Sequence, residues 1–524
     1  MNISPLKTKK TIAHDRLVLA AICSSLFILS ACSTNNALLS AQRKYRAGNF
    51  SGAHSTIARE SRNMKLDSRD AVIIKLEHAS MARTAGDQND SLAASRDADQ
   101  AIQIRDQKAL VELGKEAGAM LTNLNSLPYN ASPSEKIMGA SLLALEFAAA
   151  GDIEKARSAV KLAKNREADY IAKYQAQIEK EKNSLKEAAS KNPKVNLNLD
   201  YAKIDAKTAD LERSVNNYAP YANFSVPYAE LIAGIILGGG SNPDVSRSRE
   251  SFARCLAAYP NNESLRRAAS ASLEGTTHIV IEDGVAPSLD AYRFDLPLKI
   301  NSSLVVLSAA FPKFAPIPLA GNEVDIVAGG AHVTPSLLCD FDRIAATEYK
   351  RKLPGTIART MAASTLKAVA SYVGQEVVRQ KNGYAADALA LVSAGYNIAS
   401  AQADQRIWAT LPKQVRYAMI STPSDRKIQI GGRSVELPKA STVLVVVRSV
   451  NGAFSVQTIG LDTNTASVAG CATSSANYQI AAPSASSVPA ATSHPVEAKT
   501  ASATMNDQPA KLTTSADGTQ YLAR

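Results

Sequence analysis

The segment FAAAGDIEKA, residues 147–156, sets the fold predicted for the first half of the chain. Gly151 can end a helix because glycine readily adopts the left-handed backbone conformation. Phe147 before it and Ala156 after it place one large and one small side chain at a close helix crossing. The spacing predicts two helices joined by a tight turn, which is the unit of tetratricopeptide-like repeats.

Related patterns occur on both sides of this segment. Residues 45–53 read YRAGNFSGA and residues 82–87 read ARTAGD, so Gly48 and Gly86 occupy the turn position. A looser helix pair is expected between residues 228 and 259. The turn glycines are unevenly spaced, which favours degenerate repeats over a regular array. We predict a helical, tetratricopeptide-like domain over residues 32–270, and an all-α bundle without true repeats remains the alternative.

An aromatic cluster follows a long polar helix predicted near residues 155–191. The cluster consists of Tyr218, Tyr221, Phe224 and Tyr228. Pro220 and Pro227 lie between these aromatic residues. Aromatic side chains of this kind can line a groove that binds a protein partner. The alternative is a packed elbow between helices, in which the same rings are buried.

The hydrophobic period changes after about residue 275. Strands are predicted near residues 278–281, 292–298, 304–307, 324–327, 414–420, 427–431, 442–449 and 454–461. Helices are predicted at 336–351, 355–381 and 385–402, with Pro354 at the start of the second. Strands interrupted by a helical insertion predict a mixed or antiparallel α+β domain over residues 275–462. The chain is therefore expected to be a multidomain α and α+β protein.

Trp408 is the single tryptophan of the chain and lies in the segment DQRIWATLP, residues 404–412. With Asp404 and Arg406 it is expected to form a salt-bridged corner that holds a helix to a strand. A buried anchor for a protein partner is the alternative, because Trp and Arg are enriched at such positions.

The N-terminus has the order of a secretory signal. Basic residues precede an apolar run from Leu17 to Leu29, which is short for a membrane span. Residues 29–32 read LSAC, which resembles the bacterial lipobox, and Ser33 follows. Residues 1–31 are therefore expected to be removed and Cys32 to carry lipid. By the same resemblance, Ser33 favours the outer membrane, with the protein on its periplasmic face.

The C-terminal residues 463–524 are rich in Ala, Ser, Thr and Pro and poor in large apolar side chains. Such a segment cannot bury enough apolar surface to offset the entropy of ordering, so we predict a disordered tail.

Composition and motifs exclude several kinds of function. The 524 residues carry a net charge of +11, but the basic residues are dispersed and form no nucleic-acid motif. The six histidines give no HExxH motif or i,i+4 pair, and no P-loop or GxSxG segment occurs. We therefore expect no metal, no cofactor and no enzyme activity. Three cysteines remain beyond the lipobox, and a Cys339–Cys471 disulfide stays open while Cys255 is expected to be packed in a helix.

Taken together, these features resemble a family of bacterial lipoproteins of uncharacterised function. The resemblance covers roughly residues 30–462 and includes EDG at 282–284, DLPL at 295–298 and the Trp408 segment. It implies envelope proteins that activate peptidoglycan synthases or help surface assembly. It implies no catalytic residues.

The predicted function is that of a membrane-anchored envelope lipoprotein that serves as a protein-binding scaffold, with cell-wall synthesis as the process regulated. The alternative is a structural accessory of an envelope assembly or secretion complex, for which a homo-oligomer would suffice. An enzyme acting on the wall is a third class, and it lacks a recognisable nucleophile or carboxylate pair in this sequence.

Overall fold

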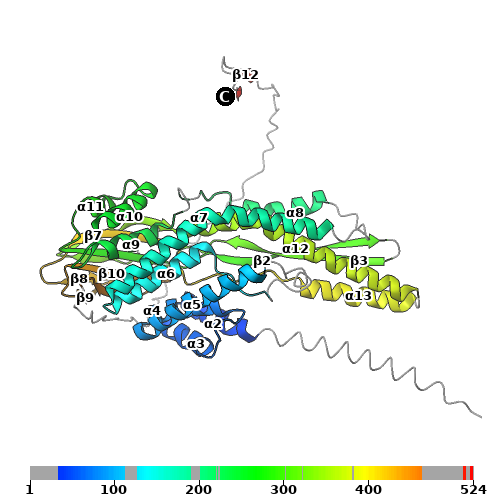
Figure 1. Cartoon of the computed structure of the whole chain (residues 1–524), viewed down its shortest axis with the longest axis horizontal. Coiled ribbons are helices and arrows are strands. Elements are labelled where there is room, and N and C mark those ends of the chain that lie inside the picture. Colours follow the sequence, from blue (N-terminus) through cyan, green and yellow to red (C-terminus); the bar gives the residue numbers. More distant parts are fainter. Residues whose placement is uncertain are drawn as a thin grey trace, which may run out of the picture. The chain divides into compact units, whose positions relative to one another are not determined.

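The computed structural model describes residues 33–112, 127–190, 201–219, 221, 225–300, 303–321, 323–380, 383–462, 512–514 and 520–522 (Figure 1). The chain divides into two compact units, Met1–Ser475 and Ala476–Arg524. The described part of the second unit is a pair of strands, β12 (Leu512–Thr514) and β13 (Gln520–Leu522). The predicted signal, Cys32 and most of the predicted tail lie outside the described residues.

The first unit begins with helices that pack against one another in chain order. They are α2 (Ser33–Arg46), α3 (Phe50–Arg62), α4 (Ala71–Ala85), α5 (Gln88–Glu112), α6 (Pro133–Ala149) and α7 (Ile153–Ser190). Four more follow, namely α8 (Tyr201–Arg213), α9 (Pro227–Gly238), α10 (Val245–Ala258) and α11 (Glu263–Ser270). The predicted helix pairs are present at all three turn glycines. Their identity as tetratricopeptide repeats stays a prediction.

The turn at Gly151 shows why the sequence folds in this way. Gly151 has φ of 79°, in the left-handed region that glycine tolerates best. The next N–H, from Asp152, donates to the carbonyl oxygen of Phe147 at 2.9 Å and closes α6. Ala156 is fully buried in α7, so the two helices approach closely at this small side chain.

A five-stranded mixed sheet forms the centre of the second half. Its strands in spatial order are β11 (Ala453–Gly460), β10 (Thr442–Val450), β1 (Thr276–Asp283), β7 (Gln414–Ser421) and β6 (Ser336–Asp340). The β1–β10 pair is parallel and the other neighbours are antiparallel. The prediction of a mixed α and β second half is confirmed.

Both faces of this sheet are covered. Val280 of β1 belongs to the hydrophobic core shared with the helices, whereas Ile279 and Ile281 face a second core. The second core is closed by a smaller sheet of β5 (Ala331–His332), β4 (Ile326–Ala328), β8 (Lys427–Ile430) and β9 (Arg433–Glu436). Successive side chains of a strand point to opposite faces, so the middle of a strand buried on both faces is apolar, as Ile279, Val280 and Ile281 are in β1.

A long hairpin and two helices form a third packed region. Strands β2 (Ser288–Ile300) and β3 (Ser303–Ala315) pair along their whole length. Helices α12 (Phe341–Arg379) and α13 (Gly383–Ser400) pack on β3 and on each other (Figure 1). Phe311 of β3 and Leu353 of α12 are buried in the core of this region.

Two local predictions in this region are wrong. Residues 336–340 form strand β6 instead of the start of a helix, because Leu337 and Cys339 pair with β7. Helix α12 also continues through Pro354, where the sequence predicted a new helix. Proline removes one helical hydrogen bond, yet packing of the buried Leu353 and Ala368 in the core of the hairpin region keeps both halves helical.

The division into a helical domain and an α+β domain stays a prediction, but the structure shows a shared core. Residues from helices α2 to α7, from α9 to α11 and from the central sheet belong to one hydrophobic cluster, whereas α8 packs in the core of the β2–β3 hairpin. The sequence boundary predicted between residues 270 and 275 falls between α11 and β1. Within the described residues, no helix is both long enough and apolar enough to cross a membrane.

Candidate functional site

The predicted aromatic cluster is dispersed over different packing sites. Tyr218 is half-buried and meets Phe314 edge-on with ring centroids 5.5 Å apart. Tyr221 is buried, its hydroxyl accepts the Asp340 N–H at 2.7 Å, and Phe224 lies outside the described residues. Tyr228 is buried and its hydroxyl donates to Glu282. These contacts are those of packed elbows between helices, and Tyr221 and Tyr228 are only 5% and 2% exposed.

Trp408 and Arg406 lie where the helices meet the α+β half. Trp408 is 1% exposed, and its indole N–H donates to Thr410 Oγ1 at 2.9 Å. Arg406 forms ion pairs with Asp70 and Asp404, each at 2.7 Å. The corner that the sequence predicted is therefore present, and its partner Asp70 precedes helix α4.

Two buried glutamates hold the Trp408 segment in place. Glu77 accepts from the Ala409 N–H at 2.7 Å, and Glu135 accepts from the Trp408 N–H at 2.8 Å. Burial raises the pKa of Glu77 to about 7, against hydrogen bonds from Thr410, Gln42 and Ala409 that lower it. Sequence reasoning missed both glutamates as partners of this segment. The capping pattern Ser132-x-x-Glu135 is readable from the sequence, whereas the approach of Trp408 is not.

A cavity of about 650 Å³ lies beside this corner. Its walls include Pro312, Phe314, Ile344 and Leu353, which make it largely apolar. Glu348 also lines it and accepts from the Ser134 N–H at 2.7 Å. The cavity has the size of a small-ligand site. Glu348 joins α12 to α6 through Ser134, and the other acidic lining residues, Glu135 and Asp404, bond Trp408 and Arg406. The acids at the start of α12, Asp340 and Asp342, do not line the cavity.

An exposed apolar surface lies on helices α12 and α13. We call it the α12–α13 face and define it by Val373, Val377, Tyr384, Leu391, Val392 and Tyr396. All six side chains are among the exposed large hydrophobic residues of the described chain, and Tyr384 reaches 91% exposure. No sequence motif marks this face, because α13 has the composition of an ordinary buried apolar helix.

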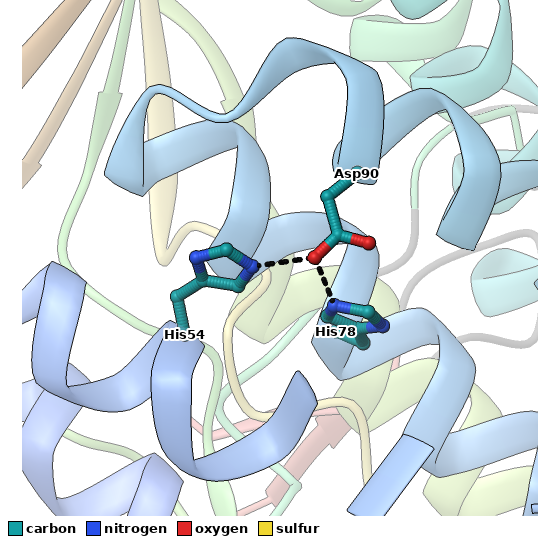
Figure 2. Close-up of side chains that lie close together, drawn as sticks. All are labelled: His54, His78 and Asp90. Carbon is teal, nitrogen blue, oxygen red and sulfur yellow. Dashed lines mark hydrogen bonds and ion pairs between the residues drawn. The ribbon is translucent and has the colours of Figure 1, made fainter. Parts of the chain in front are cut away.

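Two histidines and an aspartate meet near the N-terminus of the described chain (Figure 2). His54 Nε2 lies 2.8 Å and His78 Nε2 lies 3.0 Å from the same oxygen, Asp90 Oδ2. The imidazole rings are stacked with centroids 5.6 Å apart. The sequence offered no signal for this group, because His54 and His78 are 36 and 12 residues from Asp90 and belong to different helices.

Burial and neighbouring groups shift the pKa values of His78 and Asp90. His78 is 3% exposed, and Ser61 Oγ lies 3.0 Å from its Nδ1. Burial lowers the pKa of His78, against Asp90, which raises it. Burial opposes ionisation of Asp90, but hydrogen bonds and charge from both histidines hold its pKa below the usual value. Asp90 is therefore an ionised acceptor between two imidazoles.

The two thiols among the described residues, Cys255 and Cys339, are packed in the interior. Cys255 and Cys339 are free and buried, and burial raises both of their pKa values, so neither is a reactive thiolate. Cys255 is packed in α10, where Sγ lies 3.3 Å from the Pro227 carbonyl oxygen. Cys471 lies outside the described residues, and the Cys339–Cys471 disulfide stays a prediction.

Comparisons with protein-family models, curated proteins and solved structures found no match to this chain.

Proposed function

We propose that this chain is a lipid-anchored protein of the cell envelope that acts as a protein-binding scaffold. Anchoring rests on the lipobox-like segment ending at Cys32, which would place the protein at the periplasmic face of the outer membrane. Scaffolding rests on the α12–α13 face. The proposal contains no catalytic step, and an enzyme or assembly factor of cell-wall synthesis is the kind of partner it expects.

The α12–α13 face carries the proposal because exposed apolar patches mark interaction sites. Leu391 and Val392 are 75% and 69% exposed, and they follow Tyr384 by seven and eight positions. This spacing places the three side chains in one broad stripe along the helix. Val373 and Val377, four residues apart on α12, add to the surface beside α13.

The chemistry of α13 favours a protein over a lipid surface. Helices that lie on membranes present Lys and Arg on the face opposite the apolar one. Helix α13 contains no Lys or Arg, and its one acidic residue, Asp387, lies 3.6 Å from Arg379. Tyrosine and aliphatic side chains on a rigid helix are typical anchors of protein interfaces.

Crosslinking from defined positions tests this proposal. A photo-reactive amino acid at Leu391 should give an adduct with another envelope protein in cells. The same amino acid at Arg247, whose side chain is 70% exposed on α10, serves as the control. Leu391→Lys should abolish recovery of the partner identified in this way. Equal yields at both positions, or no adduct at Leu391, would contradict the scaffold role.

A structural accessory of an envelope assembly or secretion complex is the second candidate. It is favoured by the β2–β3 hairpin, in which each strand has one edge unpaired by any other described strand. Unpaired edges can add strands from another copy of the chain. Adducts of the chain with itself at Leu391, together with a multiple of the monomer mass in detergent, would favour this function over the scaffold.

A further inference from the structure

We propose that His54, His78 and Asp90 form a binding site for a divalent transition-metal ion, with Zn²⁺ as the best fit. Each residue offers one ligand atom, and the three atoms lie within 4.8 Å of one another. Figure 2 shows both imidazoles directed at the Asp90 carboxylate. This inference does not depend on the proposed scaffold function.

The distances suit a small tetrahedral ion. Zn²⁺ binds nitrogen and oxygen at about 2.0–2.2 Å, so neighbouring ligand atoms of a tetrahedral site are roughly 3.3 Å apart. The two nitrogen–oxygen distances, 2.8 and 3.0 Å, are slightly shorter than this. A metal between the groups would replace the two hydrogen bonds to Asp90 Oδ2 with three coordinate bonds.

Three helices supply the ligands and keep them in place. His54 lies on α3, His78 on α4 and Asp90 in the first turn of α5. Ser61 Oγ holds the second nitrogen of His78, which leaves Nε2 for the metal. Metal-binding histidines usually have such a partner on the other ring nitrogen. The backbone N–H of Asp90 donates to Asp87 Oδ1 at 3.0 Å and fixes the start of α5.

The site is open on one side. The side chains of His54 and Asp90 are 14% and 19% exposed, whereas that of His78 is 3% exposed. A polar hollow lined by Ser51, His54, Asp87, Gln88 and Asn89 adjoins the cluster. It provides an access path for the ion and room for a water molecule as the fourth ligand.

One cation competes for the carboxylate. The Arg62 guanidinium lies 3.3 Å from Asp90 Oδ2, but its side chain is 67% exposed. An exposed ion pair contributes little free energy, so Arg62 can move into solvent when the metal binds. The nearby ammonium of Lys75 is already paired with Asp97 at 2.7 Å.

The ligand set also indicates which ion would bind. Imidazole nitrogen suits Zn²⁺ and its first-row neighbours, whereas Mg²⁺ and Ca²⁺ prefer sites made entirely of oxygen. A metal here would link α3, α4 and α5, and thus fasten the first helix pair to the second.

Metal titration of the purified full chain in detergent tests the site. After chelation and dialysis, calorimetry with ZnCl₂ should show one tight site, and MgCl₂ should show none. Co²⁺ should give the visible absorption of a tetrahedral complex. His54→Gln should weaken Zn²⁺ binding at least tenfold, and Ser61→Ala about tenfold, as loss of outer partners does elsewhere.

His332→Gln is the matched control. His332 also bonds an aspartate, Asp325, at 2.9 Å, but it is 75% exposed and lies outside the cluster. Its replacement should leave the affinity unchanged. The proposal is overturned if the unaltered chain binds no Zn²⁺ in the titration, or if His332→Gln weakens binding as much as His54→Gln. If the circular dichroism spectrum shows that His54→Gln is misfolded, its affinity cannot test the site. The unaltered chain then decides, and the proposal is overturned if that chain gives no tetrahedral Co²⁺ spectrum.

Discussion

Single residues show how the fold accommodates charge in its interior. Helices α4 and α6 bury the acidic side chains of Glu77, Glu135 and Glu146. A buried carboxylate is costly unless hydrogen bonds or cations compensate it, and otherwise its pKa rises. Glu135 is compensated only in part: it accepts from the Tyr129 hydroxyl and from the Ser132 and Trp408 N–H groups, yet burial still raises its pKa.

Glu146 should make the stability of the protein depend on pH. Burial raises its pKa from 4.5 to about 7, although Arg83 opposes the shift. The folded state therefore binds a proton more tightly than the unfolded state, and this stabilisation is lost as the pH rises from 4.5 through 7. Each pKa unit corresponds to about 1.4 kcal/mol, so the loss is roughly 3 kcal/mol. Glu146→Gln should remove it, giving a more stable protein than the unaltered chain at pH 8.

Urea unfolding at pH 5 and pH 8 measures this effect. Glu154→Gln is the control, because the Glu154 side chain is 73% exposed. That variant should keep the pH dependence of the unaltered chain. The prediction fails if the free energy of unfolding changes between pH 5 and pH 8 by the same amount in Glu146→Gln as in the unaltered chain. That result would show that the Glu146 carboxyl does not have a raised pKa in the folded state.

The candidate residues also show the limit of local sequence patterns. Asp404, Arg406 and Trp408 are close in sequence, and the predicted corner is present. The acceptor of the Trp408 N–H is Glu135, which is 273 residues away and unpredicted. His54, His78 and Asp90 lie on three different helices and share no short motif of metal ligands, so sequence spacing could not predict that they meet.

At the level of elements, the turns between helices were predicted correctly, whereas the helix start at Pro354 was not. Turn glycines were predicted correctly because a left-handed residue is a local requirement. Pro354 was misread as a helix start because its cost is also local, while the packing that offsets it is not. Strand β6 was missed for the same reason, since it is defined by pairing with the distant β7.

Two alanine substitutions should therefore have opposite effects. Gly151→Ala should lower the free energy of unfolding by about 1–2 kcal/mol, because φ is 79° at this position. Gly374→Ala, inside α12, should raise it by about 0.5–1 kcal/mol, because an added Cβ meets only Leu389 Cδ2 at 3.8 Å. Denaturant unfolding of both variants at one pH provides the comparison. A stabilising Gly151→Ala would contradict the role of this turn.

At the level of the whole molecule, the two halves depend on each other. Arg83 of α4 forms an ion pair with Glu282 of β1 at 2.5 Å. Ser134 of α6 donates to Glu348 of α12 from its backbone N–H at 2.7 Å and from its hydroxyl at 2.8 Å. Together with the shared hydrophobic cluster, these contacts couple the helices to the sheet. Binding of a partner to one half would therefore also affect the stability of the other half.

The anchor is tested on the whole protein in cells. Cys32→Ala should abolish labelling by palmitate and move the protein out of the membrane fraction, because stable attachment requires several acyl chains. Cys23→Ser is the matched control, since Cys23 belongs to the predicted signal and should leave labelling intact. Persistent labelling of Cys32→Ala would refute the lipoprotein proposal.

The sequence by itself determined the helix turns, most strand positions and the change from helices to strands near residue 275, because these depend on residues that are neighbours in the chain. Tertiary structure alone decided the parallel pairing of β1 with β10, the continuity of α12 and the meeting of His54, His78 and Asp90. It also decided that Tyr228 is buried while Tyr384 is exposed. These outcomes depend on which surfaces pack together, and packing joins residues that no local pattern relates.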